Sequence, residues 1–67
     1  MPNFLFEIVS GDYEGEEFFV QAANKIDATT LARKVAEGEK IRYLGAYNDE
    51  EAEWMGYDTY SVEDYYF

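Results

Sequence analysis

The sequence of 67 residues contains no cysteine and no histidine. Without cysteine, no disulfide can staple the chain and no thiolate can bind zinc. Without histidine, neither a Ser-His-Asp nor a Cys-His catalytic arrangement can form, and the imidazole of most transition-metal sites is missing. No run of about 18 apolar residues is present to cross a membrane. Stability must therefore come from packing, for which 48% hydrophobic and 19% aromatic residues are available.

The chain length predicts one domain, residues 1–67. A high net charge favours disorder, but seven Tyr, five Phe and one Trp supply the aromatic content that disordered acidic chains lack. Met1 is followed by Pro2 and Asn3 without a basic segment, so the sequence predicts no secretory signal and a cytoplasmic protein.

Basic residues are few and confined to one segment. Fifteen acidic residues face five basic ones, which gives a net charge of −10 at pH 7, and all five bases lie within residues 25–42. A chain of this charge does not bind phosphate backbones by counterion release. We therefore expect no direct contact with nucleic acid and no binding to an anionic membrane, but an attraction to basic protein surfaces.

Four segments have the composition of β-strands. Residues 3–9 and 16–22 are rich in strand formers and flank a turn region rich in glycine and acidic residues at 10–15, which predicts a β-hairpin. Residues 40–47 and 57–62 predict a third and a fourth strand.

Two segments have helical patterns. Apolar residues recur at helical spacing over 28–37, with Asp27 as the expected N-cap and Gly38 just past the expected end. A capping-box pattern over 48–51 predicts a short helix over 49–55.

The order of elements is β-β-α-β-(short α)-β, which predicts an α+β fold with a small antiparallel sheet and one main helix packed on one face. Alternation along the hairpin selects the residues that this helix covers. They are Phe4, Phe6, Ile8, Phe18 and Val20. The other face of the sheet is expected to be acidic and rich in tyrosine.

Nine acidic residues are candidates for binding a basic partner, because they lie in the two segments that contain no base. They are Asp12, Glu14, Glu16, Glu17, Asp49, Glu50, Glu51, Glu53 and Asp58. If the hairpin extends far enough, the first three form a row with a spacing of about 6.7 Å, and Glu7 and Glu17 lie near each other across the hairpin. Such arrays imitate the phosphates of a duplex, which recur about every 3.4 Å along each strand. The alternative is that the acids only keep a small protein soluble.

Aromatic residues are interleaved with these acids. Tyr57, Tyr65 and Tyr66 are candidates for partner binding, because tyrosine is enriched at interfaces and can stack on arginine; the alternative is that the C-terminal segment docks on the core. For Trp54, an anchor that holds the short helix to the core is favoured over an exposed binding hot spot.

Catalysis and metal binding have little support in the sequence. A domain of this size has little room for a substrate cleft, and neither a Walker loop nor a nucleophile elbow is present. The segment Asp12-x-Glu14-x-Glu16 has the alternation of an EF-hand loop but lacks its glycine and its downstream glutamate. We therefore predict no enzyme, no cofactor and no metal site.

In overall composition, and in the segments 12–17 and 49–53, the chain resembles the small acidic inhibitors that bacteriophages and plasmids use against host defence, the anti-CRISPR and anti-restriction proteins. This resemblance implies a DNA mimic that occupies the basic nucleic-acid-binding groove of a Cas effector or restriction enzyme in the host cytoplasm. The alternative function is a structural or adaptor module that binds through its aromatic surface. The chain is then expected to be a monomer or a homodimer.

Overall fold

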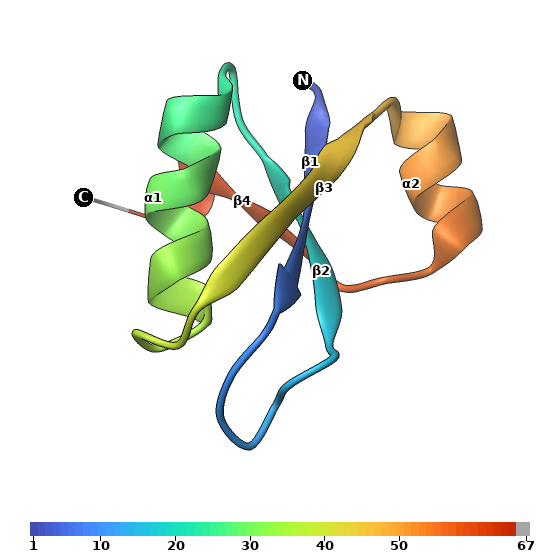
Figure 1. The fold of residues 1–67 in the computed structure, drawn as a ribbon. Coiled ribbons are helices and arrows are strands. Elements are labelled where there is room, and N and C mark those ends of the chain that lie inside the picture. The colour runs from blue at the N-terminus through green and yellow to red at the C-terminus, as the bar shows by residue number, and fades with distance from the viewer. Residues whose placement is uncertain (66–67) are drawn as a thin grey trace.

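The four-stranded sheet has two inner strands, each of which pairs with a strand on both sides (Figure 1). In the computed structural model, which describes residues 1–65, the elements follow the order β1 (Asn3–Ile8), β2 (Glu17–Gln21), α1 (Lys25–Val35), β3 (Ile41–Tyr47), α2 (Asp49–Met55), β4 (Thr59–Ser61) and a 3-10 turn η1 (Val62–Asp64). The strand order in the sheet is β3-β1-β2-β4. The predicted α+β class and the predicted element order are confirmed.

The sheet is mixed, which differs from the prediction of an antiparallel sheet. Strand β1 pairs antiparallel with β2 and β3, but β4 pairs parallel with β2. Parallel strands need a crossover connection, and α2 provides it: the chain leaves β3 at one edge, passes through α2 and returns as β4 at the opposite edge. The short helix therefore sets the direction of the last strand.

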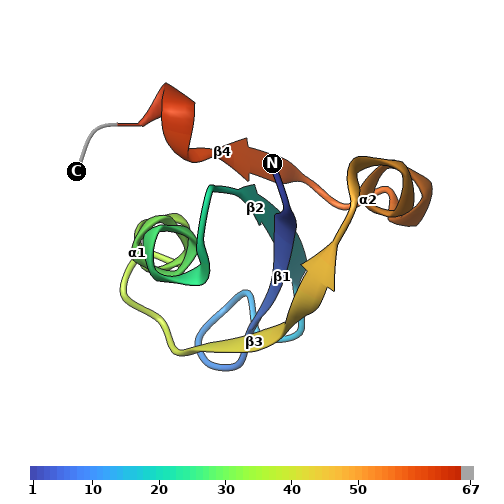
Figure 2. The same cartoon turned by 90° about the horizontal axis from the view of Figure 1, so that it is seen from above.

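One face of the sheet is covered by α1, and its core consists of the residues that alternation predicts. The side chains of Phe4, Phe6, Ile8, Phe18 and Val20 are buried in one cluster with apolar residues of α1. Leu31 of α1 is fully buried in this cluster. Figure 2 shows α1 and α2 on opposite sides of the strands.

The other face contains a second, smaller core, which corrects the prediction that it is simply acidic and tyrosine-rich. Leu5 and Phe19 are buried there against Ala52 of α2, with Tyr47 packed alongside. Tyr57 also packs against the Phe19 ring, with ring centres 5.9 Å apart. Strands β1 and β2 are therefore buried on both faces, which is why their apolar runs are continuous rather than alternating.

The main helix begins and ends earlier than predicted. Its N-cap is Asn24, whose side-chain oxygen accepts from the backbone N–H of Asp27 at 2.9 Å, so Asp27 lies in the first turn instead of capping it. At the other end, Gly38 N–H donates to the Arg33 carbonyl and Glu37 N–H donates to the Lys34 carbonyl. This pair of bonds is a Schellman motif, and it places Glu37 at φ 54, in the left-handed region.

The short helix over 49–55 is confirmed, with both bonds of the predicted capping box between Asn48 and Glu51. It ends at Gly56, whose φ of 76 suits a left-handed C-cap. In the described part of the chain, neither helix is long and apolar enough to cross a membrane.

Candidate partner-binding surfaces

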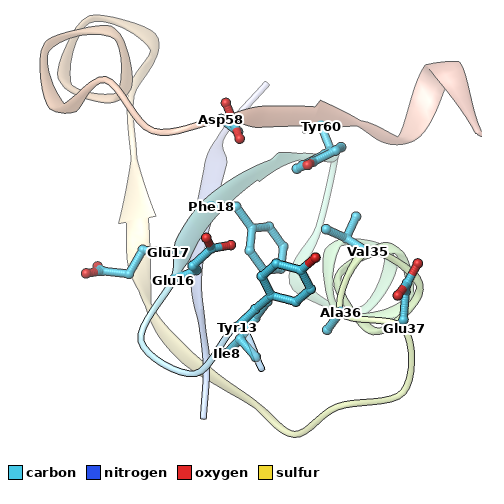
Figure 3. Close-up of a pocket in the computed structure, with 10 residues that line it drawn as sticks. All are labelled: Ile8, Tyr13, Glu16, Glu17, Phe18, Val35, Ala36, Glu37, Asp58 and Tyr60. Atoms are coloured by element: carbon cyan, nitrogen blue, oxygen red, sulfur yellow. The ribbon is translucent and has the colours of Figure 1, made fainter. Parts of the chain in front are cut away.

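A hollow of about 280 Å³ lies between the start of β2, the β1–β2 loop, the end of α1 and β4 (Figure 3). We call it the acidic hollow. It is lined by Ile8, Tyr13, Glu16, Glu17, Phe18, Val35, Ala36, Glu37, Asp58 and Tyr60. Its floor is apolar and its rim carries four carboxylates, but no lining residue is basic. Figure 3 shows Glu17 pointing away from the tyrosine rings, which leaves Glu16, Glu37 and Asp58 as the acids around them.

The backbone fixes two of these acids at the mouth of the hollow. Ile8 N–H donates to the Glu16 carbonyl at 2.9 Å, which closes the base of the hairpin and holds Glu16 beside β1. Phe19 N–H donates to the Asp58 carbonyl at 2.8 Å, which holds Asp58 beside β2. The third acid, Glu37, is placed by the Schellman motif at the end of α1.

The hollow has a negative potential that acts on Tyr60. The pKa of the Tyr60 hydroxyl is raised by burial first, and then by the negative charges of Asp58, Tyr65 and Glu16. Burial disfavours any charge, but the negative charges of Asp58 and Glu16 that add to the shift favour a cation in the same place. The arrangement therefore suits a positively charged side chain with an apolar stem.

Lys25 and Arg42 contact groups outside the acidic hollow. Lys25 Nζ lies 4.1 Å from the centre of the Tyr43 ring. Arg42 Nη2 lies 2.5 Å from Glu7 Oε1, the one ion pair found among residues 1–65. Glu7 in turn lies opposite Glu17 in the β1–β2 register, as predicted. Arg42 therefore offsets the charge of Glu7 within the sheet, and neither Lys25 nor Arg42 lines the acidic hollow.

The second candidate region is on α2, and we call it the α2 surface. It is an open hollow of about 470 Å³ lined by Tyr47, Asn48, Glu50, Glu51, Trp54 and Met55. The Trp54 side chain is 91% exposed, so the favoured prediction that Trp54 anchors the helix is wrong. The anchor is Ala52, which packs on Leu5 and Phe19. The exposed hot-spot alternative for Trp54 thus gains support.

The acids of α2 are divided between structural and free positions. Asp49 Oδ1 accepts from Asn3 Nδ2 at 2.7 Å, and Glu51 Oε1 accepts from the Asn48 backbone N–H at 3.2 Å. Within residues 1–65, Glu50 and Glu53 have no hydrogen-bond or ion-pair partner, and both are exposed. Of these two carboxylates, only that of Glu50 lines the α2 surface.

The structure brings only some of the predicted site residues together. Glu16, Glu17 and Asp58 meet at the acidic hollow, while the four acids of α2 lie on the other side of the sheet. Asp12 and Glu14 lie in the β1–β2 loop and not in a strand, so the predicted row with Glu16 does not form. Glycines at positive φ, Gly11 and Gly15, turn the chain there.

The predicted tyrosines also differ in their placement. Tyr57 is packed on Phe19, and Tyr65 is 41% exposed after η1. Tyr66 lies outside the described residues. Glu37 is not among the residues predicted from the sequence, because its place at the hollow depends on where α1 ends.

Among the described residues, no group of three or more acidic side chains is arranged to hold a metal ion. Comparison of the chain with protein-family models, with curated proteins and with solved structures found no match.

Proposed function

We propose that this chain is a protein-binding inhibitor that docks on a basic surface of its partner through the acidic hollow. The observation that carries this proposal is the combination in one hollow of an apolar floor, two tyrosines and carboxylates without a lining base. A general excess of acid for solubility does not require such a floor.

The hollow suits a lysine or arginine side chain of the partner. The apolar stem of such a side chain packs on Phe18 and Val35, and its charged end lies among the carboxylates of Glu16, Glu37 and Asp58. The Tyr13 and Tyr60 rings add faces on which a cation can lie. These contacts favour a basic side chain over an apolar or acidic one.

The partner class follows from what basic protein surfaces normally bind. Grooves rich in lysine and arginine hold the phosphates of nucleic acids. A chain with a net charge of −10 that docks in such a groove excludes the nucleic acid. We therefore propose a nucleic-acid-binding partner, with host-defence nucleases and effector complexes as the specific class, in line with an anti-CRISPR or anti-restriction role.

A second candidate function is supported by the exposure of Trp54. An adaptor that binds through its aromatic surface would use this residue, and its binding would depend little on salt. The two functions are separated by variants that change only one surface.

The test uses two double variants with the same net charge. Glu16→Gln with Asp58→Asn removes two acids of the hollow, and Glu63→Gln with Asp64→Asn removes two exposed acids of η1. Affinity for a panel of basic nucleic-acid-binding proteins is measured at low and high salt, with duplex DNA as competitor. We expect the hollow variant to bind about tenfold more weakly and the η1 variant to bind nearly as the unmodified chain does.

The proposal fails if both variants lose affinity equally, because the charge then acts without a site. It also fails if duplex DNA and the chain bind the partner together. Binding that persists at high salt and is lost in Trp54→Ala supports the adaptor function instead.

A further inference from the structure

The α2 surface has a feature that the acidic hollow does not explain: a tryptophan whose side chain is 91% exposed. An indole in water gives up the stabilisation that burial of its large apolar area provides. Ala52 faces the sheet, and at 100° per residue Trp54 lies about 200° further around the helix, which directs it to solvent. The fold thus presents Trp54 and does not bury it.

The surroundings of Trp54 form a floor and a rim. Glu50 and Trp54 are four residues apart on α2, as are Glu51 and Met55, so each pair lies on one helix face. Tyr47 and Asn48 line the other side of the hollow. The floor is therefore aromatic and apolar, and Glu50 supplies an exposed carboxylate without a partner among the described residues.

This surface is held in a fixed position. The capping box sets the first turn of α2, and Ala52 seats the helix on Leu5 and Phe19. Asn3 Nδ2 donates both to the Tyr47 carbonyl at 3.3 Å and to Asp49 Oδ1 at 2.7 Å, which ties the end of β3 and the start of α2 to β1. A preorganised surface loses little conformational entropy on binding.

We infer that the α2 surface is a docking site for an arginine side chain of a partner protein. A guanidinium group stacks on an indole ring and forms paired hydrogen bonds with a carboxylate, and the Trp54–Glu50 pair offers both. Lysine has no planar group to stack, and an acidic partner is repelled by Glu50 and Glu51. Charge complementarity favours a basic partner over a second copy of this chain, because each copy carries a net charge of −10.

This inference goes beyond the proposed function, because it rests on α2 and not on the acidic hollow. Since Trp54 is the single tryptophan of the chain, its fluorescence and its indole N–H resonance report on this surface alone. The full chain is titrated with three short peptides of the same sequence that carry arginine, lysine or citrulline at one central position. We expect the arginine peptide to shift the Trp54 signals, the lysine peptide to bind several-fold more weakly, and the citrulline peptide not to bind.

Two variants of α2 form a matched pair. Glu50 lines the hollow and Glu53 does not, although both are exposed acids of the same helix. Glu50→Gln is expected to weaken binding of the arginine peptide about two- to fivefold, while Glu53→Gln leaves it unchanged. Equal effects of the two variants, or equal affinity for arginine and lysine, would overturn the inference.

Two further measurements separate arginine binding at the α2 surface from binding at the acidic hollow and from self-association. The double variant Glu16→Gln with Asp58→Asn should leave the Trp54 signals and peptide affinity unchanged, so failure at one surface is distinguishable from failure at the other. Sedimentation of the unmodified chain and of Trp54→Ala should show the same mass. A dimer that Trp54→Ala dissociates would overturn the inference, because a second copy would then occupy the surface.

Discussion

Replacing Phe19 by leucine is expected to loosen α2 from the sheet while the α1 side of the core stays intact. Phe19 is 0% exposed, and its ring lies 5.9 Å from both the Tyr47 and the Tyr57 rings. Loss of buried ring area and of two aromatic pairs lowers the free energy of unfolding by about 2–4 kcal/mol. A chain of this length has a free energy of unfolding of about 3–10 kcal/mol, so the variant remains mostly folded unless the total lies near the lower end of that range.

Phe18→Leu is the matched control, because the neighbouring residue faces the other side of the sheet. Phe18 is also buried and also has two ring partners, Phe6 at 6.1 Å and Tyr60 at 5.8 Å. The two variants should therefore lose similar free energy of unfolding in urea titrations followed by circular dichroism. They should differ in which helix loses protection of its amides against hydrogen exchange.

Amide hydrogen exchange measures that difference. Two hydrogen bonds report on α2: Ala52 N–H donates to the Asn48 carbonyl, and Gly56 N–H donates to the Ala52 carbonyl. One bond reports on α1, in which Ala36 N–H donates to the Ala32 carbonyl. Phe19→Leu should reduce protection of the α2 amides more than that of the Ala36 amide. Equal loss of protection at both helices in both variants would refute the division of the core into two clusters.

Two further predictions concern the end of α1 and the acidic hollow. Glu37→Gly should raise the free energy of unfolding by about 1 kcal/mol relative to Glu37→Ala in urea titrations, because both variants remove the charge but only glycine relieves the left-handed backbone; equal stability of the two would contradict the assigned φ. Tyr60 has a pKa raised above 10.0 in the folded chain, so its contribution to stability is complete below pH 10 and is lost as the pH rises through the folded pKa. Tyr60→Phe should therefore lose less stability than the unmodified chain between pH 9 and pH 12, and parallel pH profiles would contradict the raised pKa.

The sequence predicts the element order well, because each element has a local pattern. Asn48 and Glu51 stand at the spacing of a capping box, and the structure contains both of its bonds. The predicted start of the main helix is wrong because Asn24 and Asp27 are both good caps, and the exposed Ile26 breaks the apolar pattern in the first turn. Local patterns cannot rank two caps three residues apart when tertiary packing decides between them.

The direction of β4 and the burial of the second face depend on long-range contacts. A strand of three residues has no pattern that shows which neighbour it pairs with. The apolar pairs Leu5–Phe6 and Phe18–Phe19 are typical of burial on both faces, but what covers the second face depends on the position of α2.

The candidate sites are predictable only in part for the same reason. The acids of α2 are adjacent in the sequence, so their common helix was predictable. The acidic hollow joins Glu16, Glu37 and Asp58 from three distant segments, and only the fold brings them together. The exposure of Trp54 does not follow from the sequence because a short helix can dock through a small residue, and here Ala52 permits a closer approach to Phe19 than an indole would.

The most direct test of the proposed function is displacement of labelled duplex DNA from a basic nucleic-acid-binding protein that binds this chain. The unmodified chain and the η1 variant, Glu63→Gln with Asp64→Asn, should release the DNA at the same concentration, and the release should weaken as salt is raised. The hollow variant, Glu16→Gln with Asp58→Asn, should need about tenfold more protein. Equal displacement by all three, or a ternary complex that retains the DNA, would contradict the proposal that the acidic hollow takes the place of nucleic acid.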